Sequence, residues 1–424
     1  MYIFLDKINS FIWSNGTVAI ILMVGVMYTI KLKGIQFRII PYLIKSSKCS
    51  EKTGGISQKK TVAMSLGTAM GTGNITGVAS ALAIGGAGSI FWMWVSAFTG
   101  MAVVYAENYL SSAYSSGSVK GPMAYISKGI GSRLLAAFFA VMCIGACFGM
   151  GGMVQINSMC DSVRSCIPLQ PVITAVILFM IILSITSGGA KRIGSVAQFL
   201  LPFAAVSYTL MCLYILFIKC HAIPAAFGSI FSSAFGLRQA AGGLSGFTVS
   251  KALTTGIRRG IFSNEAGLGS SPILHSAANS NDVELQGMWS MLEVFFDTMI
   301  CCTLTAIVLL CAAPDMSVNS AFSDVLGDRA DIFIAAELSV FAFCTVIGWY
   351  YCGETAFIYI SGGSHKMFFC IAYSAIASAG ALLKAEAVWT ISDIFNGLMA
   401  FPNLLALILL SGKVKTNKTS SGSQ

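Results

Sequence analysis

The sequence predicts an all-α integral membrane protein with about eleven transmembrane helices. Only 10% of the 424 residues are charged and 56% are hydrophobic, whereas soluble domains carry roughly 25% charged residues. Long uncharged stretches recur along the chain, and most approach the roughly 20 apolar residues that cross about 30 Å of hydrocarbon. The alternating pattern of a membrane β-barrel is absent, so helices that satisfy their own backbone groups are expected.

Taken in order, the uncharged stretch 8–30 gives a first span that is too long for a secretory signal and lacks a cleavage pattern. The stretch 61–106 is long enough for two spans, and further stretches give the remainder. We place the spans near residues 10–30, 62–84, 89–112, 134–157, 171–188, 194–218, 245–280 (interrupted), 288–312, 332–359, 367–383 and 388–411.

Basic residues predict the orientation. With the N-terminus outside and the C-terminus in the cytoplasm, the cytoplasmic loops hold most of the lysines and arginines, as the positive-inside rule expects. The net charge of +9 is therefore spread between spans, and no nucleic-acid partner is expected. The sequence does not assign a side to Lys251, Arg258 and Arg259. The cytoplasmic set is Lys31, Lys33, Arg38, Lys45, Lys48, Lys52, Lys59, Lys60, Lys120, Lys128, Arg133, Lys191, Arg192, Lys366, Lys413, Lys415 and Lys418.

Glycines interrupt the second span at positions 67, 71, 73 and 77, with Thr72 and Asn74 among them. Glycine costs about 1 kcal/mol in a helix interior relative to alanine, so the cluster favours local unwinding. The alternative is close packing of small residues against a neighbouring helix. Gly67 and Gly71 have the spacing for such packing, but Ile75 breaks it, and packing does not explain the two polar residues. We expect an interrupted helix.

A second glycine-rich segment, 263–272, lies in the span already marked as interrupted. It carries Asn264 and the carboxyl group of Glu265, and polar groups at membrane depth are costly and usually mark a site. The alternative for Glu265 is an ion pair with Arg258 or Arg259, and the sequence leaves both interpretations open.

The two interrupted spans occupy matching places in two halves of the chain. We divide the chain into an extra helix and loop (1–60), a first repeat (61–218), a second repeat (240–411) and a disordered cytoplasmic tail (412–424). Five spans in each half force opposite orientations, and matched interruptions are a pointer to the central site of a transporter. The helix after Gly73 presents free N–H groups to a carboxylate, and carbonyls near 68–71 and 260–264 suit an ammonium group or sodium.

At these residues the sequence resembles the alanine or glycine:cation symporter family of bacteria and archaea. The resemblance rests on the segments 71–79, 91–94, 105–107, 121–126, 256–270, 296–298 and 348–354, and it extends from about residue 10 to 411. It implies the leucine-transporter fold, with two inverted five-helix repeats and one extra helix. It also implies sodium- or proton-coupled uptake of alanine or glycine, with glutamine preferred by some members, across a prokaryotic cell membrane. Sodium would be the co-transported cation, with no further cofactor and no obligate protein partner.

The resemblance also implies site residues. The amino acid would lie between Gly71, Thr72, Gly73 and Asn74 on one interrupted helix and Asn264, Gly267 and Gly269 on the other. Trp349 would wall the pocket, the alternative being an aromatic belt at the membrane interface. Thr345 would hold sodium with the backbone carbonyls near Met70 and Gly71, unless its hydroxyl bonds back to its own helix.

Four further positions are candidates for contact with the amino acid or the cation. Phe148 is a candidate apolar wall or a core residue, and Gln155 is a candidate polar contact. The family pattern has an asparagine where this chain has Gly152, which predicts a wider pocket or an altered cation site. Asp297 is a candidate proton or sodium group, and the alternative is a packing role through bonds to Thr298 or Thr303.

Other classes fit the sequence less well. An ion channel would carry a filter built by oligomeric symmetry rather than two dissimilar interruptions. Paired carboxylates, a histidine cluster or a nucleophile motif at catalytic spacing are absent from the sequence, which disfavours an enzyme. A Gly-x-x-x-x-Gly-Lys loop is absent as well, which disfavours ATP-driven transport.

Overall fold

The computed structural model describes residues 2–41, 57–236, 245–278, 282–313 and 315–415. Over these residues the chain is helical apart from turns, short connections and one isolated β-bridge between Ser116 and Val119. Seven helical stretches among them are long and apolar enough to cross a membrane: Leu5–Lys31, Gly88–Tyr114, Arg133–Cys166, Gly189–Ile218, Val283–Ala312, Val318–Ser361 and Ala385–Leu409. The class of fold, an all-α membrane protein, is therefore confirmed.

The first part of the chain forms thirteen of the helical segments, some of them a single turn. They are α1 (Tyr2–Ile12), α2 (Asn15–Lys31), η1 (Ile35–Arg38), α4 (Gln58–Ala69), η2 (Thr72–Asn74), α5 (Thr76–Gly85), α6 (Gly88–Tyr114), α7 (Gly121–Ala124), η3 (Tyr125–Ile130), α8 (Arg133–Ala146), η4 (Cys147–Met153), α9 (Val154–Cys166) and α10 (Pro171–Thr186).

The remaining segments run from the middle of the chain to its end. They are α11 (Gly189–Ile218), η5 (Cys220–Ala222), α12 (Ile223–Ala234), α13 (Ser245–Asn264), α14 (Ser270–His275), α15 (Val283–Val294), η7 (Phe295–Cys302), α16 (Thr303–Ala312), α17 (Val318–Leu326), η8 (Gly327–Arg329), α18 (Ala330–Ser361), α19 (Lys366–Ala379), η9 (Gly380–Leu382), α20 (Ala385–Leu409) and η10 (Ser411–Lys413).

Two of the expected spans are broken, as the glycine clusters predicted. The first runs through α4, the 3₁₀ turn η2 and α5, with Gly71 in an extended conformation between the helices. The second stops at the end of α13 and resumes at α14, and three residues of the gap have left-handed backbone: Glu265 (φ 56°), Gly267 (φ 86°) and Gly269 (φ 83°). Pro272 fits the first turn of α14 because the N–H groups there need no partner within the helix.

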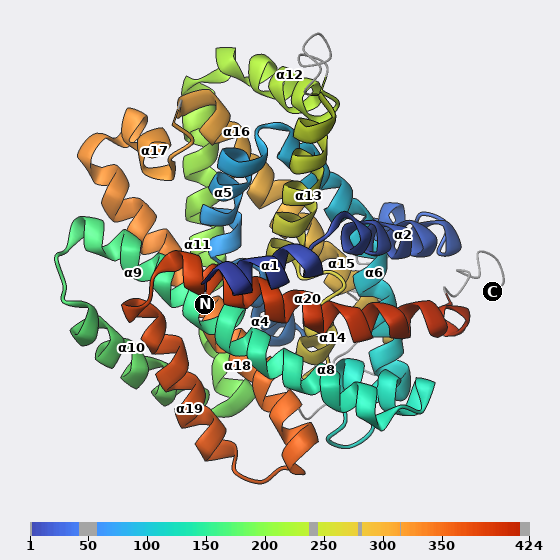
Figure 1. The fold of residues 1–424 in the computed structure, drawn as a ribbon. Coiled ribbons are helices and arrows are strands. Elements are labelled where there is room, and N and C mark those ends of the chain that lie inside the picture. Colours follow the sequence, from blue (N-terminus) through green and yellow to red (C-terminus); the bar gives the residue numbers. More distant parts are fainter. Residues whose placement is uncertain (1, 42–56, 237–244, 279–281, 314, 416–424) are drawn as a thin grey trace.

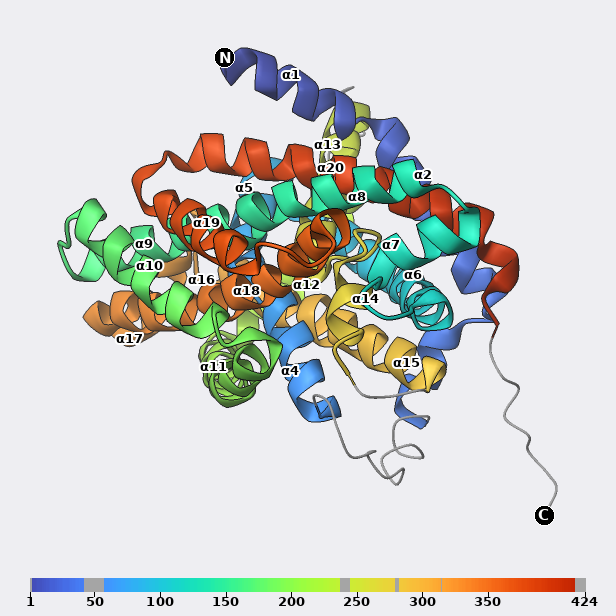
Figure 2. The same cartoon turned by 90° about the horizontal axis from the view of Figure 1, so that it is seen from below.

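The helices that carry the two breaks are neighbours at the centre of the bundle. Helix α13 packs against α5 and α6, and α18 packs against α4, α8, α9 and α11. Figure 1 shows α5 and α13 side by side, and α16 packs against both α5 and α11. In Figure 2 the N-terminal helix α1 lies at the rim of the molecule, where it packs on α20. The core of the bundle therefore surrounds the two breaks.

The outward face of α11 shows what surrounds the bundle. Phe199, Phe203 and Phe217 are 80%, 76% and 79% exposed and lie on one stripe of this helix. Large apolar side chains exposed in this number are typical of contact with lipid. We therefore expect this face of α11 to contact the lipid bilayer.

The remaining four of the eleven expected spans are the two broken helices and the shorter helices α10 and α19, so the count of eleven stays a prediction. The start of the second repeat at 240, the loop lysines Lys45, Lys48 and Lys52, Lys418 and the tail from 416 lie outside the described residues. Ordered structure extends past 411, because η10 forms a turn there and Val414 is buried.

Candidate functional site

The first break is held by side chains from two other helices. The Oε1 atom of Gln155 on α9 accepts a hydrogen bond from the backbone N–H of Thr72 at 3.0 Å, and its Nε2 donates to the carbonyl of Met150 at 3.1 Å. The hydroxyl of Thr345 on α18 donates to the carbonyl of Gly67 at 3.1 Å. Gln155 and Thr345 therefore bind the freed backbone groups on the two sides of Gly71.

Gly71 is required by this close approach. A Cβ atom at this position would lie 2.5 Å from Thr345 Oγ1 and 2.9 Å from Gln155 Oε1. Gly73 similarly faces the second broken helix, where its Cβ would lie 3.3 Å from the Cα of Ser263. The glycines of the first break thus let its backbone approach side chains of α9 and α18 and the end of α13.

The second break is organised around Glu265. One carboxylate oxygen accepts a hydrogen bond from Trp349 Nε1 at 2.8 Å and the other accepts one from the hydroxyl of Ser270. The side-chain oxygen of Asn264 accepts the N–H of Ala266 at 3.1 Å, and its amide group donates to Thr298 at 3.3 Å. The left-handed backbone at Glu265 is therefore stabilised by partners on both sides of the gap.

A single buried carboxylate joins the two breaks. Asp297, in the π-helical segment η7, accepts a hydrogen bond from Asn74 Nδ2 at 2.7 Å on its Oδ1 atom. Its Oδ2 atom accepts hydrogen bonds from the hydroxyls of Ser263 and Thr298, at 2.7 and 2.8 Å. The side-chain oxygens of Asn74 and Thr72 are buried and have no hydrogen-bond partner among the described residues. The site therefore holds unused oxygen acceptors beside a carboxylate.

The space between the breaks is small. A cavity of about 10 Å³, roughly the volume that one water molecule needs, is lined by Ser65, Asn264, Glu265, Ser271 and Glu293, among others. A second of the same volume adjoins Gly267. Binding of a solute larger than water between the breaks therefore requires side chains or helices to move.

Polar and aromatic contacts flank the breaks on two sides. In the last turns of α13, Arg258 forms an ion pair with Asp393 of α20. The Cζ atom of Arg259 lies 4.4 Å from the centroid of the Trp389 ring. The rings of Phe262 and Trp389 are 4.7 Å apart. On the other side, His275 at the end of α14 bonds to Glu293 of α15, with Nε2 3.0 Å from Oε1. The two breaks thus lie between these two sets of contacts.

Several alternatives raised by the sequence are wrong. Glu265 forms no ion pair with Arg258 or Arg259, since Arg258 pairs with Asp393 and the carboxyl group is held by Trp349 and Ser270. Trp349 is fully buried and is not part of an interfacial belt. The Thr345 hydroxyl bonds across to α4 rather than to its own helix. The expected bond from Asp297 to Thr298 is present, and the contacts with both breaks add to it.

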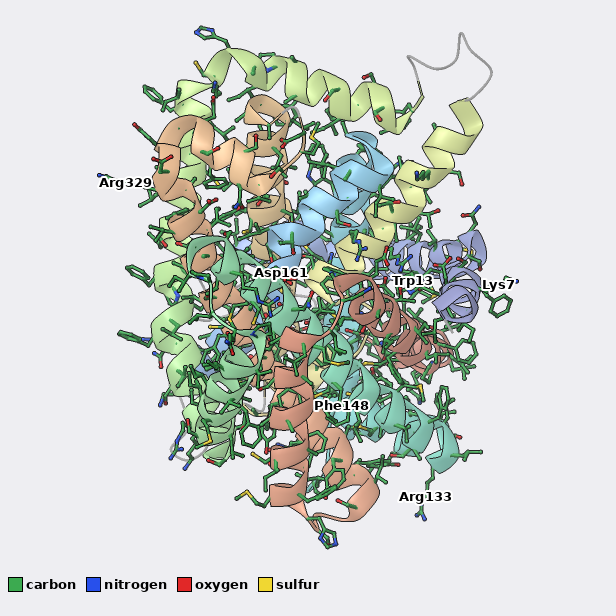
Figure 3. The ribbon with its side chains drawn as sticks, turned by 60° about the vertical axis from the view of Figure 1, so that its left-hand side comes forward. Lys7, Trp13, Arg133, Phe148, Asp161 and Arg329 are labelled. Atoms are coloured by element: carbon green, nitrogen blue, oxygen red, sulfur yellow. The ribbon has the colours of Figure 1, made fainter. Side chains whose placement is uncertain are left out.

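Phe148 lies in η4 and is labelled in Figure 3. Its ring packs against Phe369 and Tyr373 of α19, at centroid distances of 5.9 and 6.2 Å, which fits the core role rather than the pocket wall. Gly152 also faces α19, because a Cβ there would lie 2.9 Å from that of Ala377. The missing asparagine therefore does not widen the space between the breaks.

Sequence reasoning missed three residues that hold the breaks. Ser263 bonds to Asp297, and its position next to Asn264 was the available signal. Asn403 of α20 donates to the carbonyl of Gly267 at 2.8 Å and to the buried carboxyl group of Glu107. The signal for Glu107 was a carboxyl group inside an apolar span, whereas Asn403 follows only from the packing.

Two broken helices whose ends meet buried polar side chains, inside a bundle of long apolar helices, define a secondary membrane transporter. Comparison with known proteins gives the family. The chain belongs to the sodium:alanine symporter family, whose sequence profile matches residues 1–420. The resemblance noted from the sequence is thereby confirmed, and the family is one of transporters rather than enzymes.

Three relatives cover nearly the whole chain. The sodium/alanine symporter AgcS of Methanococcus maripaludis is 39% identical over 432 residues, which cover 96% of this chain and 94% of the relative. The probable sodium/glutamine symporter GlnT of Bacillus subtilis is 34% identical, covering 96% and 88%. The putative sodium/proton-dependent alanine carrier protein YrbD of Bacillus subtilis is 33% identical, covering 96% and 90%. The family thus couples amino-acid transport to sodium.

Proposed function

We propose that this protein imports alanine or glycine together with sodium by alternating access, in the plasma membrane of a prokaryotic cell. The proposed architecture is eleven transmembrane helices in the leucine-transporter arrangement, with repeats at 61–218 and 240–411 and the N-terminus outside. The observation that carries the proposal is the buried carboxyl group of Asp297, which accepts hydrogen bonds from Asn74 at one break and Ser263 at the other. One sodium ion moving inward across 100 mV supplies about 2.3 kcal/mol to such a cycle.

The first break suits the amino-acid carboxylate. Helix α5 begins just after the break, so its free N–H groups and positive dipole end face the gap, where Gly71, Thr72, Gly73 and Asn74 form the proposed cradle. At the second break, Asn264, Gly267, Gly269 and the Trp349–Glu265 pair are proposed to hold the remainder of the amino acid. The unpaired oxygens of Thr72 and Asn74 offer acceptors for an ammonium group.

Sodium is proposed to bind at Thr345 and the carbonyls of Met70 and Gly71. The Thr345 hydroxyl already lies at Gly71, and sodium prefers hard oxygen ligands of this kind. Gln155 is proposed as a positioning residue that holds Thr72, and Asp297 as a second cation group, for sodium or a proton. Among the described residues, clusters of three or more His, Cys, Asp or Glu side chains that would hold a transition metal are absent.

The alternative within the same fold is a carrier that prefers glutamine or couples to protons. The relatives named for glutamine and for sodium/proton-dependent alanine transport support keeping it. An ion channel is disfavoured, because the cavity that adjoins both broken helices is about the size of one water molecule.

The test is uptake of labelled alanine into proteoliposomes. We expect saturation with alanine and dependence on an imposed sodium gradient. Competition by the other amino acids and their D-forms then ranks the substrates. The Asn74→Ala variant should lose alanine binding while staying folded, and Asn319→Ala is its control, because Asn319 also bonds to an aspartate, Asp331, at the periphery. Uptake that ignores sodium and does not saturate, or unchanged affinity in Asn74→Ala, contradicts the proposal.

A further inference from the structure

His275 ends α14, the second half of the interrupted helix, and is buried. Both nitrogens of its ring face side-chain oxygens. Nδ1 lies 2.7 Å from Oε1 of Gln286, and Nε2 lies 3.0 and 3.1 Å from the two carboxyl oxygens of Glu293. The ring is therefore fully engaged by two residues of α15.

Gln286 also pairs with a second amide, that of Gln58. Its Nε2 donates to Oε1 of Gln58 at 2.8 Å, and Gln58 Nε2 donates back to its Oε1 at 3.4 Å. In the structure the oxygen of Gln286 is the atom that faces His275, and it accepts a hydrogen bond when the ring carries its N–H at Nδ1. The Nε2 atom faces a carboxyl group, so a proton must lie between these two groups as well. When both ring nitrogens donate in this way, His275 and Glu293 hold one proton more than a neutral imidazole and a carboxylate would.

The pair lies between two cavities. His275 and Gln286, with Lys120 and serines at the end of α6, line an open polar vestibule of about 370 Å³. Glu293 lines the small cavity at the second break, together with Asn264 and Glu265. In the topology predicted from the basic residues, Lys120 lies on the cytoplasmic side. A solute that leaves the breaks toward this vestibule must therefore pass the His275–Glu293 pair.

The pair also ties together three helices. The hydroxyl of Ser65 on α4 donates to Glu293 Oε2 at 2.7 Å, and Gln58 of the same helix bonds to Gln286. Helices α4, α14 and α15 are therefore connected through one hydrogen-bonded network. Opening the route requires this network to break.

We propose that His275 and Glu293 form a proton-binding site that exchanges with the cytoplasm through the vestibule and that holds the cytoplasmic route closed while protonated. On deprotonation, the proton leaves to water in the vestibule, and the lone pair of Nε2 then faces a carboxylate. The buried Glu293 carboxylate then keeps only the hydrogen bond from Ser65 and is repelled by this lone pair, so α14 and α15 separate. This inference takes the direction of transport and the transported solutes from the proposed function.

The other charged groups nearby have partners of their own. Lys120 donates to the carbonyl of Ser276 at 3.1 Å and to the hydroxyl of Tyr351 on α18 at 3.4 Å. Glu265 at the break bonds to Trp349 and Ser270, and Glu107 on α6 bonds to Asn403. On α4, Lys60 donates away from the site to Ser195, and α7 carries no titratable side chain. Glu293 is therefore the ionisable group in direct contact with His275.

The first experiment measures sodium-driven alanine uptake into right-side-out membrane vesicles, with the outside pH fixed and the inside pH varied over about pH 5 to 8, where histidine titrates. We expect uptake by the unaltered protein to rise with inside pH, by at most about tenfold per pH unit for one proton. His275→Gln and Glu293→Gln should show a flat profile. His365→Gln is the control, because this exposed histidine precedes α19 on the same predicted side. An unchanged profile in His275→Gln overturns the inference.

The second experiment does not depend on transport. The chain has three histidines, so imidazole NMR signals of histidine-labelled protein in detergent micelles are resolved and are assigned by the single variants. We expect one signal, lost in His275→Gln, to titrate differently from His365 and to move in Glu293→Gln. A His275 signal that titrates like His365 and ignores Glu293→Gln overturns the inference. If the NMR result is as expected but sodium-driven uptake is absent, the proposed function is contradicted and the proton-binding site is not.

Discussion

Replacing Gly71 by alanine tests the closest contact in the site. The added Cβ would lie 2.5 Å from Thr345 Oγ1 and 2.9 Å from Gln155 Oε1, well inside ordinary van der Waals separation. The backbone at Gly71 has φ −114°, which alanine adopts without strain. The whole effect therefore comes from displacing the two side chains that bind the first break.

Overpacking of this kind costs about 1–3 kcal/mol. The Thr345 hydroxyl is held by the carbonyl of Gly67, and Gln155 is held by the N–H of Thr72, so neither moves without losing a hydrogen bond. If the substitution destabilises the sodium-bound state by this amount, the half-saturating sodium concentration rises roughly 5- to 150-fold, because each 1.4 kcal/mol is a factor of ten.

The assay is alanine uptake against sodium concentration in proteoliposomes. Gly77→Ala is the matched control, because its Cβ would meet nothing nearer than a carbonyl at 3.9 Å, and it should leave the sodium dependence unchanged. The refuting result is a Gly71→Ala variant with the sodium dependence of the unaltered protein and the same thermal stability. Such a result would mean that the contacts at Gly71 have no part in cation binding.

Three further outcomes are expected. Thr345→Ala should raise the half-saturating sodium concentration by roughly fivefold, since one ligand or hydrogen bond contributes about 1 kcal/mol, whereas Thr345→Ser should restore it; equal curves for all three proteins would remove Thr345 from the cation site. Trp349→Phe removes the N–H that donates to one oxygen of Glu265, and an unsatisfied buried acceptor costs about 1–3 kcal/mol. The alanine affinity measured by calorimetry should therefore fall by about 5- to 150-fold. Unaltered affinity would show that this hydrogen bond does not shape the pocket. Asp393→Asn removes the partner of Arg258, so labelled alanine should exchange faster with the outside solution; slower or equal exchange would mean that the ion pair is not a gate.

Local composition was enough to predict both breaks. Glycine clusters destabilise a helix wherever they occur, so the interruptions at Gly71 and at Gly267–Gly269 follow from the chain itself. The polar residues inside those clusters, Asn74 and Asn264, were predicted to lie at the breaks for the same reason, and both lie there.

The partners of the breaks were less predictable because they come from distant segments. Gln155 is 83 residues from Thr72, and Asp297 is 223 residues from Asn74. Neither the period of the hydrophobic pattern nor the cost of burying a carboxyl group indicates which helix will lie opposite. Glu265 shows the same limit, since two arginines close to it in sequence pair elsewhere and its partner Trp349 is 84 residues away.

The carboxyl group of Asp297 has one oxygen for each break: Oδ1 for Asn74 and Oδ2 for Ser263. Movement of one break relative to Asp297 therefore removes a hydrogen-bond donor from one oxygen, Asn74 from Oδ1 or Ser263 from Oδ2, while the other oxygen keeps its donor. The lone pair that has lost its donor can then bind a cation. Mechanical displacement and ion affinity are thus linked through the two atoms of a single side chain.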